Sequence, residues 1–300
     1  MAFEAPERLV RALGELPGSS EDGTGRWLGE LPERARDAVE HRGLAVQRVQ
    51  APGGRSSLVV LVRYPDGTPA TLKLAPPAAR PDRELAALAH WGGFGAVRVL
   101  DTRHEDGALL LERLQPEVTL RSLPEAKALL EAAGTVRRLW VEPPAGHPFE
   151  TVAGRTGREA AVLEAAPAEL RALADAALGA RAELVAVPSE EFLLHGAFRQ
   201  GKVLAGDRAP WLAVGPDPVV GERAYDLARL VRDRPEDQVA ASTAAAGVRR
   251  RVNRLADSLE VDADRLRGWT LFRAVESGLR ASAAGRRRDA ELLLEFASWL

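Results

Sequence analysis

The pattern of apolar residues changes once along the chain, near residue 115, and this change constrains the fold more than any other feature. Before it, short apolar and β-branched runs such as Leu58–Tyr64 and Ala70–Ala75 flank turn signals such as Pro65-Asp66-Gly67. After it, apolar residues recur mainly at helical spacing. A strand-rich first third followed by a helix-rich remainder predicts an α+β protein with two lobes, residues 1–114 and residues 115–300.

The first lobe is predicted to hold two helices and then a small antiparallel sheet of five strands with one inserted helix. The helices are expected over residues 4–16 and 26–41, with Pro17-Gly18-Ser19-Ser20 between them, and near 82–91. The strands are expected near 44–50, 58–64, 70–75, 96–102 and 108–114, the last two joined by the turn Glu105-Asp106-Gly107. In the second lobe, helical patterns cover about 124–141, 157–178, 222–232, 236–258, 262–283 and 286–300, and a hairpin-like region spans 192–214.

The composition argues against several classes of protein. The chain has no cysteine, so it forms no disulfide and has no thiolate metal site or nucleophile. It has no apolar run of about 18 residues, and Glu4 and Glu7 precede any apolar stretch, so we expect a cytoplasmic protein with no membrane span. A net charge of −2 argues against bulk attraction to nucleic acid, and the arginine runs at 249–251 and 286–288 are interpreted as solvated helix faces.

Lysine is rare in this arginine-rich chain and occurs only at Lys73, Lys127 and Lys202. Lys73 lies in a predicted strand, and Glu84 opens the predicted helix that follows it. A strand lysine paired with a helix glutamate is the arrangement that holds nucleotide phosphates in kinases. We therefore predict a phosphate-binding pair here; the alternative is a lysine on an exposed strand face.

Gly53, Gly54 and Ser56 lie between two predicted strands, shortly before Lys73. Glycines allow backbone amides to approach an anion such as a phosphate group. These three residues are therefore assigned to the candidate nucleotide site, although an ordinary hairpin turn explains the same pattern.

Several strings spread over most of the chain are more specific than these patterns. They are Arg26-Trp27-Leu28, Thr71-Leu72-Lys73-Leu74, Gly95-Ala96-Val97-Arg98-Val99-Leu100-Asp101, Gly107–Leu114, Leu193-Leu194-His195-Gly196 and, most distinctive, Pro218-Val219-Val220-Gly221-Glu222-Arg223-Ala224-Tyr225-Asp226-Leu227-Ala228. Together they resemble the aminoglycoside and hydroxyurea phosphotransferase family. The resemblance implies a protein kinase-like fold of two lobes, ATP as phosphate donor and a small antibiotic-like acceptor. It also implies that the backbone near Glu112 and Leu114 hydrogen-bonds adenine.

The resemblance breaks down in the loop that should carry the chemistry. The family loop reads His-Gly-Asp, then a histidine two places on, then Gly-Asn. This chain keeps His195 and the glycine after it, but it has Ala197 at the position of the aspartate base and Arg199 at that of the second histidine. Lys202 stands at the position of the magnesium-binding asparagine.

A second magnesium ligand is also replaced. Gly215 stands where the family has an aspartate, just before Pro216. Asp226, which in related folds ties down the catalytic loop from the next helix, is retained. The resemblance therefore implies that the frame of the loop is kept while its base and both metal ligands are lost.

These replacements change the chemistry in two ways. Magnesium prefers oxygen ligands, which alanine, glycine and an ammonium group do not offer. From a usual kinase rate of ~1–100 per second, loss of the base and of the metal clamp leaves a rate on the order of 10⁻³ per second or lower. The loop is also more positive than the family pattern by roughly four charges, so it favours anions.

We therefore predict an inactive member of the family, a pseudokinase that binds ATP, another nucleotide or another anion without magnesium. Lys202 would contact the phosphates or, in the alternative, point to solvent. A second hypothesis is an active ATP-dependent phosphotransferase acting on a hydroxyl of streptomycin, hydroxyurea or a related small molecule. It requires a shifted metal site, for which Asp217 is the nearest carboxylate, whereas Glu190 and Glu191 are expected to face solvent. A third is a folded scaffold with no ligand. The expected partner is a small molecule, with no nucleic acid and no membrane.

Overall fold

The computed structural model describes residues 3–15, 23–101, 107–187, 190–239 and 244–300. The chain folds into two compact units. The N-terminal unit comprises Met1–Glu117 and Leu204–Leu212, and the C-terminal unit comprises Val118–Val203 and Ala213–Leu300. The structure thus differs from the expected division at residue 114 by adding the short segment 204–212 to the N-terminal unit.

The N-terminal unit is built on an antiparallel sheet of five strands, as predicted. The strands are β1 (Ala45–Val49), β2 (Leu58–Arg63), β3 (Pro69–Leu74), β4 (Val99–Asp101) and β5 (Ala108–Glu112), in the spatial order β1-β2-β3-β5-β4. Lys73 lies on the central strand β3, paired with Val59 of β2 and Leu109 of β5. Because side chains alternate across a strand, Leu72 and Leu74 point to the face opposite Lys73.

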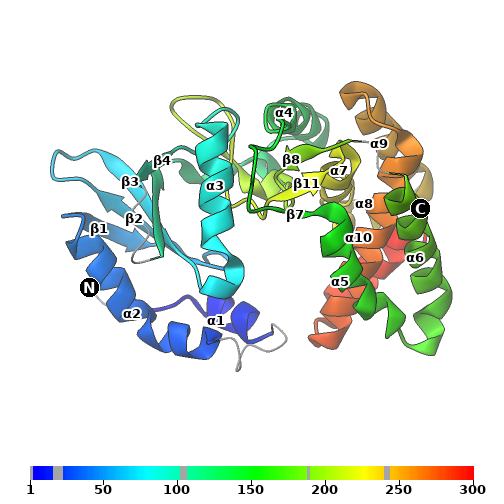
Figure 1. The fold of residues 1–300 in the computed structure, drawn as a ribbon, viewed down its shortest axis with the longest axis horizontal. Coiled ribbons are helices and arrows are strands. Elements are labelled where there is room, and N and C mark those ends of the chain that lie inside the picture. Colours follow the sequence, from blue (N-terminus) through cyan, green and yellow to red (C-terminus); the bar gives the residue numbers. More distant parts are fainter. Residues whose placement is uncertain (1–2, 16–22, 102–106, 188–189, 240–243) are drawn as a thin grey trace. The chain divides into compact units, whose positions relative to one another are not determined.

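Helices cover both faces of this sheet. The helices α1 (Glu7–Gly14) and α2 (Thr24–Glu40) bury Leu9, Leu31 and Ala35 in one core with Leu72 and other residues of the sheet. The helix α3 (Pro81–Trp91) contacts β4 and β5, on the face to which Lys73 points (Figure 1). Two predicted connections, residues 17–20 and the turn residues 105–106, lie outside the described part of the chain.

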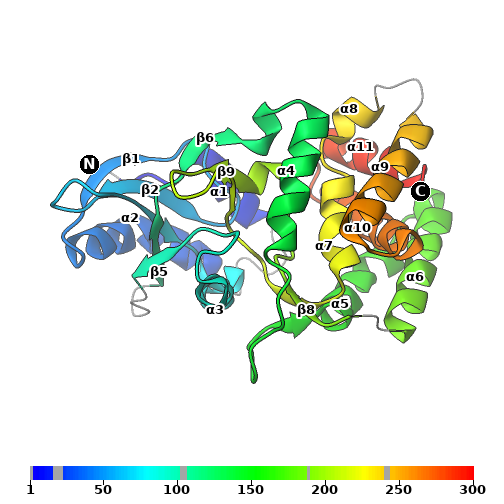
Figure 2. The ribbon, with the colours of Figure 1, turned by 90° about the horizontal axis from the view of Figure 1, so that it is seen from above.

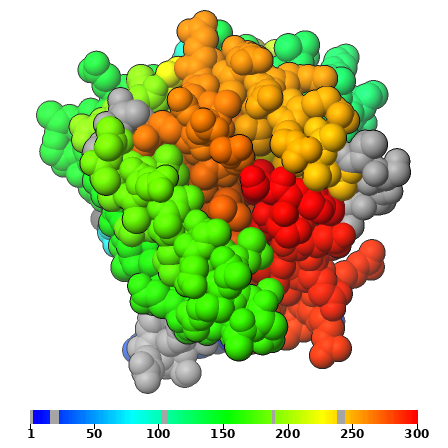
Figure 3. Space-filling view, turned by 90° about the vertical axis from the view of Figure 1, so that its right-hand side faces the viewer, coloured from blue at the N-terminus to red at the C-terminus, as the bar shows by residue number. Residues whose placement is uncertain are grey.

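The C-terminal unit is mainly helical, also as predicted. Its helices are α4 (Glu125–Arg137), α5 (Val152–Glu164), α6 (Arg171–Ala186), α7 (Arg223–Val231), α8 (Pro235–Val239), α9 (Ala244–Leu259), α10 (Ala263–Ala283) and α11 (Arg287–Ala297). The long helix α10 contacts α5, α6, α7, α9 and α11, and Figure 2 shows α7 beside it. On the surface drawn in Figure 3, α6 in green, α10 in orange and α11 in red lie side by side. None of the described helices combines the length and apolar character that a membrane span requires.

Short strands frame the loop that carries the candidate chemistry. The strands β7 (Glu150–Thr151), β11 (Val219–Gly221) and β8 (Phe192–Leu194) form a sheet in that order. Since β8 and β11 are antiparallel, the residues that follow Leu194 lie next to those that precede Val219. A further small sheet, ordered β10 (Leu212–Ala213), β9 (Val203–Ala205) and β6 (Gln115–Thr119), involves strands at the division between the units.

The prediction of one helix over residues 157–178 is wrong. Two helices occupy this stretch, because α5 ends at Glu164 and α6 begins only at Arg171. Pro167 lies between them; it lacks a backbone N–H and its ring clashes with a helical carbonyl, so a helix does not continue through it. Apolar residues at helical spacing on both sides, such as Leu163 and Ala174, made the stretch look continuous.

Candidate functional site

The predicted pair in the N-terminal unit is formed. The ammonium group of Lys73 on β3 donates a hydrogen bond to the Oε2 atom of Glu84 on α3. Both side chains are largely buried, with 13% of Lys73 and 6% of Glu84 exposed. The second carboxylate oxygen of Glu84 is buried and has no hydrogen-bond partner among the described residues. The geometry matches a kinase-like phosphate-binding pair, and binding itself stays a prediction.

Gly53 has a conformational reason to be glycine that is independent of any ligand. Its φ is +71°, and a Cβ atom there would lie 2.9 Å from the carbonyl oxygen of Gln50. Gly54 is partly exposed and Ser56 is exposed. The turn therefore explains Gly53 without a phosphate, and a role for the three residues in nucleotide binding stays a prediction.

The polar groups of Glu112 are engaged within the N-terminal unit. Its backbone N–H donates to the carbonyl oxygen of Arg98 at 2.9 Å. Its carboxylate accepts hydrogen bonds from the Arg98 amide at 2.7 Å and from the Arg208 guanidinium at 2.7 Å. Leu114 nearby has a buried side chain. The contact of this segment with adenine is untested, and Glu112 already has structural partners.

In the C-terminal unit, the carboxylate of Asp226 on α7 accepts hydrogen bonds from the backbone amides at the start of the loop, as the resemblance implied. Its Oδ1 atom accepts from the Gly196 amide at 2.9 Å, and its Oδ2 atom accepts from the His195 amide at 3.0 Å. The indole N–H of Trp140 lies 3.4 Å from Oδ2. Because Asp226 is fully buried, these donors replace the water that the carboxylate has lost.

His195 is a structural residue in this loop. Its Nε2 atom lies 3.2 Å from the carbonyl oxygen of Val214, and its Nδ1 atom accepts from the Ala197 amide at 3.3 Å. Both contacts suit a neutral ring with the proton on Nε2. Burial, followed by the positive charge of Lys202, lowers the pKa of His195 well below its ordinary value, so the ring stays neutral.

The three replaced positions lie in this same frame. Ala197 is buried and presents only a methyl group. Lys202 is partly buried, and its ammonium group donates to the carbonyl oxygen of Gly215 at 2.5 Å. The hypothesis that Lys202 points freely to solvent is therefore wrong. The Val214 amide donates to the Lys202 carbonyl oxygen, which brings the Gly215 carbonyl oxygen within reach of the ammonium group. A cation thus lies where the resemblance predicts two ligands of a magnesium ion.

Two carboxylates near the loop, those of Asp217 and Glu190, form ion pairs with arginines. Asp217 is exposed, but its Oδ1 atom pairs with Arg155 of α5 at 2.8 Å, and Arg155 also donates to the Asp217 carbonyl at 3.1 Å. The expectation that Glu190 faces solvent is wrong, since it pairs with Arg223 at the start of α7. Glu191 is exposed, as expected.

A cluster of polar groups from α5, α7 and α10 was missed by the sequence analysis. Burial and the neighbouring Glu276 raise the pKa of Glu159 to about 7, against the lowering effect of Arg273 and other arginines. The hydroxyl group of Tyr225 interacts electrostatically with Arg273 and Glu159. Its oxygen is buried and has no hydrogen-bond partner in the described part of the chain. No motif marks this cluster, because its residues come together only when three helices pack.

We expect the E159Q variant to remove a fall in stability between about pH 4.5 and pH 7. Unfolding returns the carboxyl to its ordinary pKa of 4.5, whereas in the folded protein it is about 7. Between these values the folded state binds more protons, so its stability decreases as the pH rises, by on the order of 1–3 kcal/mol. Urea denaturation at pH 5 and pH 8 measures this difference between variant and wild type.

The matched control is E164Q, which alters an exposed glutamate on the same helix. It is expected to leave the pH dependence of the free energy of unfolding unchanged. If E159Q and wild type lose stability equally between pH 5 and pH 8, the raised pKa of Glu159 is contradicted.

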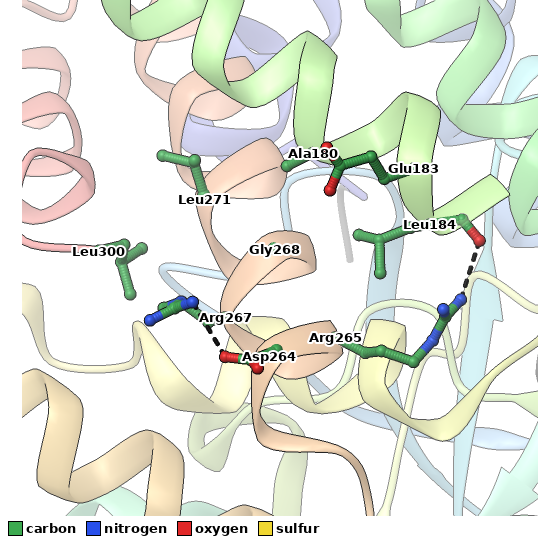
Figure 4. Close-up of a pocket in the computed structure, with 9 residues that line it drawn as sticks. All are labelled: Ala180, Glu183, Leu184, Asp264, Arg265, Arg267, Gly268, Leu271 and Leu300. Atoms are coloured by element: carbon green, nitrogen blue, oxygen red, sulfur yellow. Dashed lines mark hydrogen bonds and ion pairs between the residues drawn. The ribbon is translucent and has the colours of Figure 1, made fainter. Parts of the chain in front are cut away.

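A pocket of about 540 Å³ lies elsewhere in the C-terminal unit, between α6 and α10 (Figure 4). Its lining residues are Ala180, Glu183, Leu184, Asp264, Arg265, Arg267, Gly268, Leu271 and Leu300. Arg267 pairs with Asp264, and Arg265 donates to the carbonyl oxygen of Leu184, so its arginines are committed to structural contacts. None of the residues predicted to bind nucleotide or metal lines this pocket.

Comparison with solved structures defines the class of protein. A thermostable mutant of aminoglycoside phosphotransferase APH(4)-Ia, in a ternary complex with ADP and hygromycin B, matches with a TM-score of 0.62 and 18% identity. The match covers 88% of this chain and 96% of that chain. At this identity the likeness shows the fold alone, and it confirms the predicted kinase-like fold with an antiparallel-sheet unit and a helical unit.

Sequence comparison then defines the family. Residues 42–285 match the family described as aminoglycoside/hydroxyurea antibiotic resistance kinase. Streptomycin 6-kinase of Streptomyces griseus is 37% identical over 97% of each chain. Hydroxyurea phosphotransferase of Kitasatospora aureofaciens is 37% identical over 92% of this chain and 79% of its own. The chain therefore belongs to the aminoglycoside/hydroxyurea antibiotic resistance kinase family, as its motifs predicted.

Proposed function

We propose that this family member binds a nucleotide or another phosphate-bearing anion without magnesium and does not transfer phosphate. The observation that carries the proposal is the contact of the Lys202 ammonium with the Gly215 carbonyl oxygen at 2.5 Å. The contact supports the proposal because it joins the two residues at the predicted metal-ligand positions through an ammonium group. Lys73 and Lys202, each considered within its own unit, are proposed to contact phosphate oxygens, and a small molecule is the proposed partner.

The donor set around the loop does not fit a magnesium ion. Magnesium requires near-octahedral oxygen coordination, and the side chains of Ala197 and Gly215 contain no oxygen. Asp217 has an exposed carboxylate, but Arg155 holds both its side chain and its carbonyl oxygen. Among the described residues, no group of three or more His, Asp or Glu side chains is placed to hold a metal ion.

A second candidate is an active phosphotransferase that acts on a hydroxyl of streptomycin, hydroxyurea or a related molecule. It is supported by the names of the relatives, a streptomycin 6-kinase and a hydroxyurea phosphotransferase, each 37% identical. These similarities favour transfer, whereas the residues of the loop favour binding alone. The second candidate requires Asp217 to leave Arg155 and to become a metal ligand.

One experiment separates the candidates: melting temperature with ATP, in excess magnesium or in EDTA, together with ATP turnover in the presence of streptomycin or hydroxyurea. We expect ATP to raise the melting temperature equally in both buffers, with turnover below about 10⁻³ per second. Magnesium-dependent turnover with an acceptor would establish the second candidate. A melting temperature that no nucleotide changes would leave only the scaffold without a ligand.

We expect the K73M variant to weaken ATP binding at least tenfold, because it removes the cation of the predicted phosphate-binding pair. The control K127M replaces an exposed lysine on α4 and should bind ATP as the wild type does. Since K73M leaves a buried Glu84 without its cation, K73M/E84Q removes both charges and separates lost binding from lost folding. Unchanged ATP affinity in both Lys73 variants would exclude this residue from the site.

A further inference from the structure

Arg229 on α7 is a cation without a counterion. The side chain makes no hydrogen bond or ion pair to any residue of the described chain. The residue is partly exposed. None of its nitrogens is both fully buried and without a hydrogen-bond partner. Most of the side chain is therefore covered, and the residue as a whole keeps some contact with solvent. Arg229 follows Asp226 by three positions, so it lies on the loop-facing side of the helix.

Other arginines surround this cation. Arg273 of α10 donates to the carbonyl oxygen of Gly196 at 2.7 Å and to that of Tyr225 at 3.0 Å. Arg232, one turn beyond Arg229, donates to the Arg273 carbonyl oxygen at 2.7 Å. Burial, followed by the charges of Arg232, Arg273 and the loop residue Arg199, lowers the pKa of Arg229 well below its ordinary value, against a smaller raising effect of Tyr225.

The acidic groups of this region are fewer than its arginines and are shared with other partners; Asp233 and Glu276 act on Arg232, and Glu159 lies near Arg273. Asp233 accepts from the Gln200 amide at 2.6 Å and pairs with Arg121 at 3.5 Å. Glu276 pairs with Arg280 on its own helix. Asp226 is directed at the two loop amides that it accepts from. The cluster of Arg199, Arg229, Arg232 and Arg273 therefore has an excess of positive charge in a partly dehydrated place.

We propose that Arg229, flanked by Arg199 and Arg232, binds a phosphate-type oxyanion within the C-terminal unit. A planar guanidinium offers paired N–H donors that match two oxygens of a tetrahedral anion. An anion bound there relieves the repulsion among the arginines and supplies a counterion that Arg229 does not have among the described residues. This site goes beyond the proposed function, because it involves neither Lys73 nor Lys202 and does not require a nucleotide.

The probe is inorganic phosphate, with sodium chloride at matched ionic strength as the reference. Phosphate is expected to raise the melting temperature of the wild type and to give a saturable binding isotherm by calorimetry. The R229Q variant should weaken that affinity at least tenfold. R229Q should also melt higher than the wild type in chloride and lower than it in saturating phosphate, because it removes both the unpaired charge and the site.

Two further variants keep the test specific. R288Q replaces an exposed arginine of α11 in the same unit and should behave as the wild type in both buffers. K202Q removes a contact of the proposed nucleotide site, so it shows whether a response to phosphate arises at that site instead. If K202Q loses the response and R229Q keeps it, the Arg229 site is overturned while the proposed function stands. If the wild type responds to phosphate no more than to chloride, Arg229 is a solvated arginine and the inference fails.

Discussion

Magnesium-dependent ATP turnover should rise at least about 100-fold when Ala197 becomes Asp, Lys202 becomes Asn and Gly215 becomes Asp in one protein. The triple variant removes the ammonium that now contacts the Gly215 carbonyl and supplies oxygen donors at both predicted metal positions. It also puts a carboxylate at the predicted base position. Gly215 has φ of +60°, a left-handed conformation that aspartate tolerates better than most residues, so the backbone can accept the change.

The measurement is steady-state ATP consumption with streptomycin or hydroxyurea, in magnesium and in EDTA. The matched control is A197N/K202N/G215N, which has nearly the same shape but no new carboxylate, and it should stay inactive. Thermal melting of both triple variants checks that they fold. If the carboxylate variant folds but consumes no ATP, restoring the family residues at these three positions is not sufficient for phosphate transfer.

The D226A variant should lose about 3–5 kcal/mol of stability, the largest effect of a single substitution that we expect. Asp226 is fully buried, and its removal leaves the amides of His195 and Gly196 without their acceptor. Neither amide has an obvious replacement, because burial keeps water out. Urea denaturation measures the free energy of unfolding.

Asp264 provides the control, because it is on α10 with 84% of its side chain exposed and, among the described residues, pairs with Arg267 one turn away. D264A should change the free energy of unfolding by less than about 0.5 kcal/mol. D226N keeps the size of the side chain but turns an amide donor toward one of the loop amides, so its loss should lie between the two. If D226A costs no more than D264A, Asp226 does not hold the loop.

Much of the fold could be predicted because the two periodicities of the chain are clear. The apolar and β-branched runs at residues 58–64 and 70–75 predicted the central strands, and the turn between them left little choice of partner. Periodicity failed at residues 157–178, where one proline outweighed a continuous apolar pattern. It also missed the short strand β6, which has only one apolar side chain, Val118, and therefore carries little periodic signal.

The candidate site could be predicted only where local strings carry the information. His195, Asp226 and the pair of Lys73 with Glu84 belong to recognisable strings or to a short spacing. The contacts of Arg155 with Asp217 and of Arg273 with Gly196 join residues that are 62 and 77 positions apart. Such contacts depend on how helices pack, and a single sequence contains no local sign of them. Arg229 was missed for the same reason.

Gly196 has a consequence for how activity can be lost and regained in such a loop. Its φ is +72°, and a Cβ atom there would lie 1.8 Å from the carbonyl oxygen of Asp217, so only glycine fits. Together with Asp226, it specifies the path of the main chain at the start of the loop, through contacts in which the side chains at 197 and 202 take no part. The side chains at 197 and 202 can therefore change while the main chain at the start of the loop keeps its path. Substitutions at these two positions are expected to change the chemistry of the loop and not its fold.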